Sequence, residues 1–77
     1  MTPLDKIEIN QPAIILSFVG GEKMVQRLTQ HGIYPGDTIR ILRQAPLDGP
    51  YLVVVSGREI ILGRSLVSKI QVEVSAE

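Results

Sequence analysis

The sequence predicts a mainly β fold, a small SH3-like barrel of five strands with one short α-helix after the first strand. Two observations favour this fold. Short runs rich in Ile, Leu and Val, which favour strands, alternate with turn sequences, and only one run has helical spacing. A barrel also closes most of its strand edges, which suits so apolar a chain. With 77 residues, the chain is expected to form a single domain, residues 1–77. An OB-like barrel is the alternative, although its strands are usually longer.

The first expected strand covers residues 13–19. Alternation places Ala13 and Ile15 on one face of this strand and Ile14 and Leu16 on the other. Only one face can meet the core of a small barrel. One of these two apolar pairs is therefore expected to face outward.

A short helix is expected at residues 22–30. Met24, Val25 and Leu28 are spaced i, i+1 and i+4, which makes one apolar stripe. So short a helix is not stable in isolation, so its stability must come from packing.

The segment at residues 27–41 joins the end of this helix to the start of the next strand. Gly32 suits the left-handed position that closes a helix, and Ile33 then packs back onto the helix. Pro35 and Gly36 fit the centre of a type II turn, in which the glycine supplies a positive φ. We therefore expect positive φ at Gly32 and at Gly36.

The rest of the chain is expected to alternate strands with turns. The remaining strands are expected at residues 38–44, 51–55, 58–62 and 70–74. Residues 45–50 form a loop, and Ser56-Gly57 reads as a two-residue hairpin turn. Residues 63–68 are too short for another full helix and predict a 3₁₀ turn. Residues 75–77 form a tail.

Leu28 is expected beneath the barrel, at the centre of the core. The side chains expected around it are Ile39, Ile41, Ile60 and Ile70. In the strand at residues 58–62, alternation directs Ile60 and Leu62 inward and Ile61 outward. Truncation of Leu28 should therefore destabilise the fold strongly.

Three features carry a resemblance to a known family: Leu28, the spacing from Gly32 to Pro35-Gly36-Asp37, and the run Ala45-Pro46-Leu47-Asp48-Gly49-Pro50. In this order and at these spacings they resemble the FeoA family. Its members are small cytoplasmic partner proteins of the bacterial ferrous iron transporter. The same module is similar to the C-terminal SH3-like domain of metal-dependent repressors, and the resemblance covers most of the chain.

The resemblance also implies how the N-terminal half packs. Three side chains of the first strand then point inward, with a bulge that changes the phase: Ala13, Ile15 and Phe18. Ile14 and Leu16 face outward, where the family more often has polar residues. Leu4 matches a leucine that packs on the barrel, although residues 1–10 are alternatively a frayed terminus.

Composition limits the possible partners and locations. Eight basic and eight acidic side chains cancel, and the three aromatic residues form no stacking platform, which argues against nucleic-acid binding. The N-terminus lacks the pattern of a signal peptide, and no apolar run is long enough to insert directly into a membrane. The absence of cysteine excludes disulfides and thiolate metal sites. A cytoplasmic location is compatible with these features and is implied by the resemblance.

No pattern predicts catalysis, a cofactor or a bound metal, so the protein is expected not to be an enzyme. His31 is the single histidine, and its place at the end of the helix suits a surface residue that complements the helix dipole. Metal ligation by His31 would require partners from distant parts of the chain or from a second copy. The carboxylates form no compact ligand pattern, so we expect folding without metal and at most weak binding of Fe²⁺.

The expected function is therefore that of a binding module. The resemblance implies that it binds the ferrous iron transporter, a membrane protein, through the transporter's cytoplasmic GTP-binding domain or its membrane part, as a regulatory or scaffolding partner. The residues expected to contact this partner are Ile14, Leu16, Arg27 and Leu47. Three alternatives remain for the outward apolar residues of the first strand: a partner covers them, the N-terminal segment or the opposite strand packs over them, or the chain forms a homodimer.

Two other functions are possible. The chain could be a stand-alone regulatory domain related to metal-dependent repressors, although it contains no helix-turn-helix segment. It could also stimulate a GTPase through an arginine supplied in trans, with Arg27 or Arg43 as the candidates.

Overall fold

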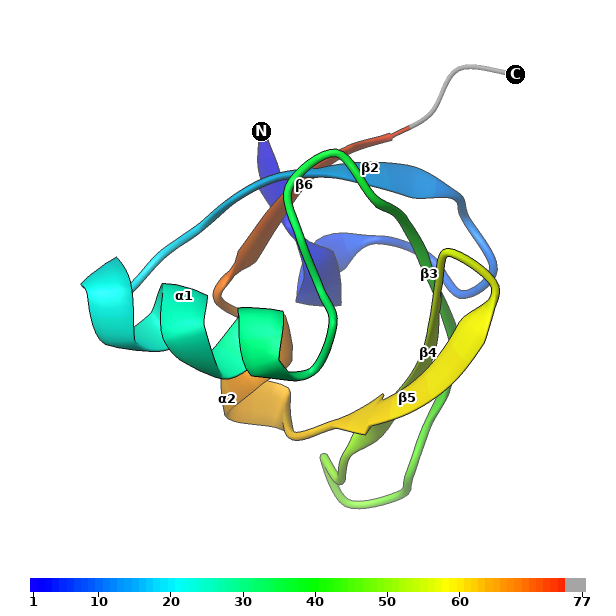
Figure 1. Ribbon diagram of the computed structural model, residues 1–77. Coiled ribbons are helices and arrows are strands. Elements are labelled where there is room, and N and C mark those ends of the chain that lie inside the picture. Colours follow the sequence, from blue (N-terminus) through cyan, green and yellow to red (C-terminus); the bar gives the residue numbers. More distant parts are fainter. Residues whose placement is uncertain (75–77) are drawn as a thin grey trace.

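The computed structural model describes residues 1–74, which form an antiparallel six-stranded sheet that curls into an SH3-like barrel (Figure 1). The strands follow the order β1-β6-β2-β3-β4-β5. Their bounds are β1 Thr2–Pro3, β2 Ala13–Phe18, β3 Thr38–Gln44, β4 Tyr51–Val55, β5 Arg58–Leu62 and β6 Ile70–Val74. The helices are α1 Gly21–Gln30, α2 Arg64–Val67 and the 3₁₀ turn η1 Leu4–Lys6. The expected tail at residues 75–77 lies outside the described residues.

The first residues of the chain form regular structure and are not a frayed terminus. Thr2 and Pro3 form β1, which pairs with Val72 and Gln71 of β6, so the sheet gains one strand beyond the five expected. Leu4 follows in η1 and is completely buried, which confirms that it packs on the barrel.

The four later strands begin and end where the sequence predicts, and α2 differs from the expectation. Residues 64–67 form one turn of α-helix, whereas the sequence predicts a 3₁₀ turn at residues 63–68. The Val67 and Ser68 N–H groups donate to the Gly63 and Arg64 carbonyls at 3.1 Å, which is α-helical i to i−4 spacing. Leu66 and Val67 are buried, so packing stabilises a turn too short to be stable alone.

β2 contains the expected bulge. Its pairing with β6 shifts between Ile15 and Ser17, so Leu16 is the extra residue. After the bulge, Phe18 lies on the same face as Ala13 and Ile15 and packs against the core. Leu16 points outward as predicted.

The helix-to-strand junction closes with a Schellman motif. The Gly32 N–H donates to the Thr29 carbonyl at 2.9 Å, and the Ile33 N–H donates to the Leu28 carbonyl at 3.1 Å. Gly32 has φ of 78°, as expected, and Ile33 is completely buried.

The turn after it is the expected type II turn. Gly36 has φ of 95°, and the Asp37 N–H donates to the Tyr34 carbonyl at 3.1 Å. The Asp37 carboxylate accepts the Tyr34 N–H at 3.0 Å. The Gly36 N–H also donates to the Ile15 carbonyl at 2.8 Å, which fixes this turn to β2.

The core lies inside the curl of the sheet, beneath α1, η1 and α2. Its buried side chains are Leu4, Ala13, Ile15, Leu28, Ile33, Ile39, Ile41, Val53, Val55, Leu62, Leu66, Val67, Ile70 and Val72. Leu28 is at 0% exposure, as predicted, whereas Ile60 is only partly buried at the margin. The apolar stripe of α1 is narrower than expected, because Val25 is exposed while Met24 packs against the core. Among residues 1–74, no helix combines the length and apolar character needed to cross a bilayer.

Candidate functional site

The four residues expected to bind a partner lie on three separate parts of the fold. Ile14 and Leu16 are on β2, Arg27 is on α1, and Leu47 is on the loop at residues 45–50. In Figure 1, β2 crosses the top of the molecule, α1 lies at the left, and this loop projects at the bottom. The structure therefore does not bring the four side chains together in one surface.

On β2, Leu16 is the more accessible of the two candidates. Ile14 is partly buried between Glu73 of β6 and Thr38 of β3, whereas Leu16 is 39% exposed at the bulge. Leu4 and Ile7 pack against the core cluster, to which neither β2 candidate belongs. The N-terminal segment is thus directed into the barrel and leaves Leu16 open to solvent.

The loop at residues 45–50 presents Leu47 in an unusual way. Leu47 has φ of 61° and Asp48 has φ of 56°, and the Gly49 N–H donates to the Pro46 carbonyl at 3.2 Å. Positive φ at both central residues is the pattern of a type I′ turn, which favours Gly, Asn or Asp. A leucine pays a steric cost there because its Cβ crowds the following carbonyl. The Leu47 side chain is 99% exposed, so no packing within residues 1–74 offsets that cost.

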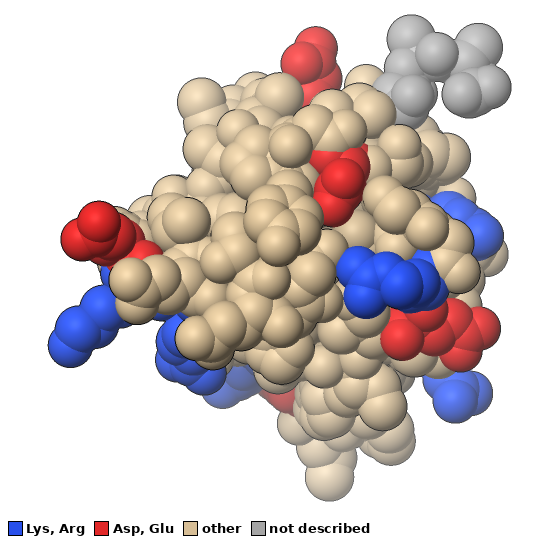
Figure 2. Space-filling view, in the orientation of Figure 1, with Lys and Arg blue, Asp and Glu red and all other residues tan. Residues whose placement is uncertain are grey.

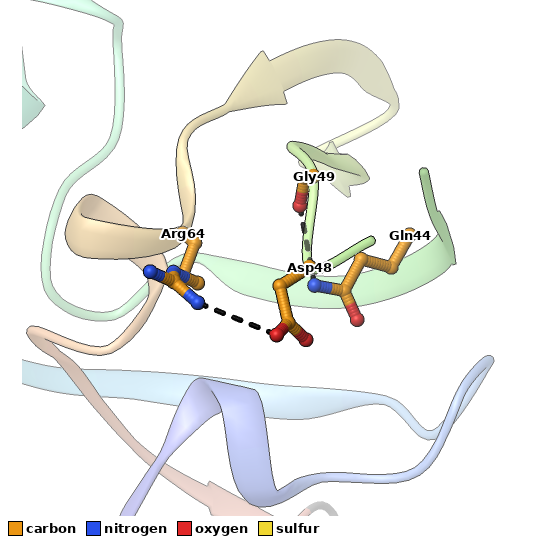
Figure 3. Close-up of polar contacts among 4 residues, drawn as sticks. All are labelled: Gln44, Asp48, Gly49 and Arg64. Carbon is orange, nitrogen blue, oxygen red and sulfur yellow. Dashed lines mark hydrogen bonds and ion pairs between the residues drawn. The ribbon is translucent and has the colours of Figure 1, made fainter. Parts of the chain in front are cut away.

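Polar contacts hold this loop in place (Figure 3). The Gln44 side-chain amide donates to the Gly49 carbonyl at 3.2 Å, and the Ala45 N–H donates to the Pro50 carbonyl at 2.9 Å. On the other side, the Arg64 guanidinium of α2 lies 3.5 Å from the Asp48 carboxylate. The loop is thus connected to both β3 and α2, which orients Leu47.

A shallow pocket of about 330 Å³ lies beside this loop. It is lined by Arg43, Gln44, Ala45, Pro46, Pro50, Tyr51, Leu52 and Ile61. Three of these residues form one transverse row across the sheet, because Arg43 of β3 opposes Leu52 of β4, which opposes Ile61 of β5. Ile61 is 70% exposed at the end of that row. The row therefore forms an apolar surface with the Arg43 guanidinium at its margin.

The pKa of Tyr51, which lines the pocket, is affected by charged residues of the loop and of neighbouring elements. Burial raises the pKa of the Tyr51 phenol, the Asp5 and Asp48 carboxylates raise it further, and the Arg64 guanidinium lowers it. The phenol therefore stays neutral at physiological pH.

Charged side chains leave much of one face free. Figure 2 shows an extended uncharged surface on the front of the molecule, with Lys, Arg, Asp and Glu gathered mainly at its margins. The tip that projects at the bottom of this view is also uncharged. Such a face is suited to protein contact rather than to binding a polyanion.

The residues considered for chemistry lie apart from one another. His31 is exposed at the C-cap of α1, as predicted, and Asp37 serves the turn at residues 34–37. Within the described part of the chain, no group of three or more His, Cys, Asp or Glu side chains could hold a metal ion. Among residues 1–74, the features that stand out for binding are the apolar surface and the loop that carries Leu47.

Sequence reasoning did not identify the pocket beside the loop at residues 45–50. It placed Ile61 outward, but the row that joins Ile61 to Leu52 and Arg43 depends on strand register and on a bulge in β3. The run of Val and Ile in β4 and β5 was the available signal, since it is apolar on both faces of the sheet.

Comparison with known proteins was consistent with this geometry. The model of the FeoA domain matches residues 2–74. "Putative Fe(2+) transport protein A" of Methanocaldococcus jannaschii is 32% identical over 73 residues, which cover 95% of this chain and 87% of that protein. The solution structure of a FeoA-like protein from Clostridium acetobutylicum superposes with a TM-score of 0.87 at 28% identity, covering 99% of this chain and 88% of that one.

The fold is also shared with a repressor. The apo form of the manganese-activated repressor ScaR superposes with a TM-score of 0.83 at 24% identity, covering 96% of this chain and 35% of the repressor. At this level of identity the likeness shows the fold alone.

Proposed function

Since the chain belongs to the FeoA domain family, we propose that it is a non-catalytic accessory protein of ferrous iron uptake that binds the ferrous iron transporter from the cytoplasmic side. The name of the relative from Methanocaldococcus jannaschii supports an assignment to Fe²⁺ transport. The contact with the transporter is proposed to use its GTP-binding domain or its membrane part.

The presentation of Leu47 is the observation that carries the proposed binding role. A fully exposed leucine on a sterically costly turn gains nothing for the free protein. Strained backbone of this kind persists where the surrounding structure fixes it, and it is often found at binding sites. Here the Gln44 side chain and the closing hydrogen bond from Ala45 to Pro50 hold the loop, and the exposed Arg64–Asp48 pair adds a weak contact, so Leu47 is oriented before it meets a partner.

Leu16 and Ile14 on β2 belong to the same proposal as a second contact area, and Arg27 on α1 belongs to it as a third. Leu16 is the main candidate there because the bulge turns it outward, whereas Ile14 is half covered by its strand neighbours. A membrane protein with both a GTP-binding domain and a membrane part could contact the loop and β2 with different surfaces.

A binding assay with folded variants tests this assignment. The full-length transporter in nanodiscs is captured, and retention of the parent is compared with that of Leu16→Lys and Leu47→Glu, each checked by circular dichroism. Val25→Lys is the matched control, because Val25 is exposed to the same degree as Leu16 but lies on α1. We expect both test variants to bind less and the control to bind like the parent.

Two results would contradict the proposal at different levels. If both test variants bind as the parent does, Leu16 and Leu47 are not the contact residues, although the accessory function stands. If the parent itself does not bind the transporter, the accessory function is wrong.

Stimulation of GTP hydrolysis is a second candidate function. The guanidinium groups of Arg27 and Arg43 are exposed and form no ion pair with any residue in the range 1–74. An arginine supplied in trans can raise GTP hydrolysis by roughly 10³-fold or more. GTP hydrolysis by the transporter, measured with the parent, Arg27→Lys and Arg43→Lys, separates an activator from a passive scaffold. Equal rates with and without the parent would exclude stimulation.

A further inference from the structure

β5 is the longer of the two terminal strands of the sheet and has one free edge. β5 is the last strand in the order β1-β6-β2-β3-β4-β5, so among residues 1–74 it pairs with β4 alone. The other terminal strand, β1, is only two residues long, whereas β5 has five. A free edge of this length exposes main-chain N–H and C=O groups that can accept another strand.

The register identifies which main-chain groups are free. Ser56 and Gly57 form a two-residue turn with φ of 49° and 85°, so the flanking Val55 and Arg58 form a hydrogen-bonded pair. Hydrogen-bonded and non-bonded pairs alternate along an antiparallel ladder. The main-chain groups of Glu59 and Ile61 therefore point away from β4, toward the open edge.

The side chains of the same two residues lie on the outer face. Ile61 extends the row formed by Arg43 and Leu52, and it lines the pocket beside the loop at residues 45–50. The Glu59 carboxylate is exposed and forms no ion pair within the part of the chain that the structure describes. A strand added to β5 would thus meet an apolar position and an acidic position two residues apart.

We propose that β5 binds an extended segment of the partner by strand addition, with an apolar side chain beside Ile61 and a basic side chain beside Glu59. This inference rests on the proposed function and specifies the form of the partner's contact. An extended backbone supplies donors and acceptors at the spacing that Glu59 and Ile61 require. Opposite charges and matched apolar groups across neighbouring strands both stabilise such a pairing.

The same register argues against a second copy of the chain as the occupant. If two β5 strands paired antiparallel so that all the free groups of Glu59 and Ile61 were used, each Glu59 would oppose an Ile61 of the other copy. That arrangement places a carboxylate beside an apolar side chain and offers it no cation. A partner with a basic residue at that position is the better match.

Hydrogen exchange measured by mass spectrometry tests the strand addition directly. Exchange of the parent is followed alone and with the full-length transporter in nanodiscs, using overlapping peptides that cover residues 58–62. We expect slower exchange at the Glu59 and Ile61 amides in the complex. The Ile60 amide, which already faces β4, serves as the internal control and should change little.

A pair of variants tests the main-chain requirement separately from the side chain. Ile61→Pro removes the edge-facing N–H and leaves the bonds to β4, while Ile61→Thr keeps the N–H and a β-branched side chain. We expect Ile61→Pro to weaken binding by about tenfold relative to Ile61→Thr, which corresponds to one lost hydrogen bond. Glu59→Lys should weaken binding more than Glu59→Gln does.

The outcomes separate this inference from the proposed function. Binding of the parent with unchanged exchange at both Glu59 and Ile61 would overturn strand addition and leave the accessory function intact. Absence of binding would overturn both. Protection of the two amides in the protein alone, rising with its concentration, would show self-pairing and would also overturn the proposal. If Ile61→Pro fails to fold, the exchange measurement on the parent still decides.

Discussion

Two tight turns of this protein contain residues with positive φ, but the turns differ in residue type and in the burial of their apolar side chains. At the junction between α1 and β3, glycines occupy the positive-φ positions, and the neighbouring apolar residue, Ile33, is completely buried. In the loop between β3 and β4, Leu47 and Asp48 occupy such positions, and Leu47 is fully exposed. The first turn satisfies both backbone sterics and the hydrophobic effect, whereas the second satisfies neither at Leu47.

This difference is the reason why the second turn, and not the first, is proposed as a contact site. The junction connects α1 to the sheet and places Leu28 and Ile33 in the core, so stability alone accounts for its residues. Stability does not account for Leu47, because a glycine or asparagine would fit its backbone better. The exposure and backbone strain of Leu47 therefore support the proposal that it is a contact residue.

The largest expected difference between the two regions concerns truncation of their leucines. Leu28→Ala should lower the free energy of unfolding by about 2–5 kcal/mol, because it leaves a cavity beneath the barrel. Leu47→Ala should change it by less than about 0.5 kcal/mol, because no packing is lost. Urea denaturation of both variants measures the contrast. A Leu28→Ala variant as stable as the parent would show that α1 does not pack as described.

Valine at the junction glycines should have the next largest effect. Gly36→Val should cost about 1–3 kcal/mol through backbone strain alone, since nothing lies within 4 Å of an added Cβ. Gly32→Val should cost a similar amount, because the atom 2.5 Å from its Cβ is Arg58 Nη2, the end of an exposed side chain that can move away at the loss of its 2.8 Å hydrogen bond to the Gly32 carbonyl. Thermal melts of the two variants and the parent measure these losses of stability.

Gly63→Ala is the matched control for these substitutions. Gly63 has φ of −65°, and an added Cβ would meet nothing within 4 Å. Alanine is a poorer N-cap than glycine for α2, but it also reduces the freedom of the unfolded chain, so we expect a net change of less than about 1 kcal/mol. If Gly63→Ala lost as much stability as Gly36→Val, the Gly36 effect could not be assigned to positive φ.

Leu47→Asn should produce a smaller effect of opposite sign. Asparagine tolerates the left-handed region, so the variant should gain about 0.5–1 kcal/mol of stability while binding the transporter less tightly. Urea denaturation and the nanodisc capture assay measure the two properties on the same sample. A variant that is no more stable than the parent would contradict the strain assigned to Leu47.

The smallest expected effect concerns Tyr51 and pH. The pKa of its phenol lies above the ordinary value of 10.0, so the folded protein holds this proton more tightly than the unfolded chain does. Stability should therefore be unaffected at neutral pH and should fall as the pH rises above about 10. Tyr51→Phe should reduce that fall. Denaturation midpoints of the two proteins at neutral and alkaline pH measure the difference.

The sequence predicted those elements whose signals are local. The turn residues at 32–36 and the alternation of β3 to β6 depend on backbone sterics and on the two faces of a strand, so neighbouring residues suffice. β1 was missed because Thr2 and Pro3 carry no strand pattern and are held by β6. The helical form of α2 likewise depends on the burial of Leu66 and Val67, which sequence spacing could not reveal.

For the candidate site, the sequence by itself determined that Leu47 lies in a loop and that Ile61 faces outward. Only the tertiary structure placed Ile61 and the loop that carries Leu47 at one pocket and separated them from Leu16 and Arg27. It also decided that Leu47 adopts a positive φ, in a loop closed by the Gln44 side chain and by the hydrogen bond from Ala45 to Pro50. Local residue types set backbone preferences and faces, but which faces meet depends on pairing between distant segments.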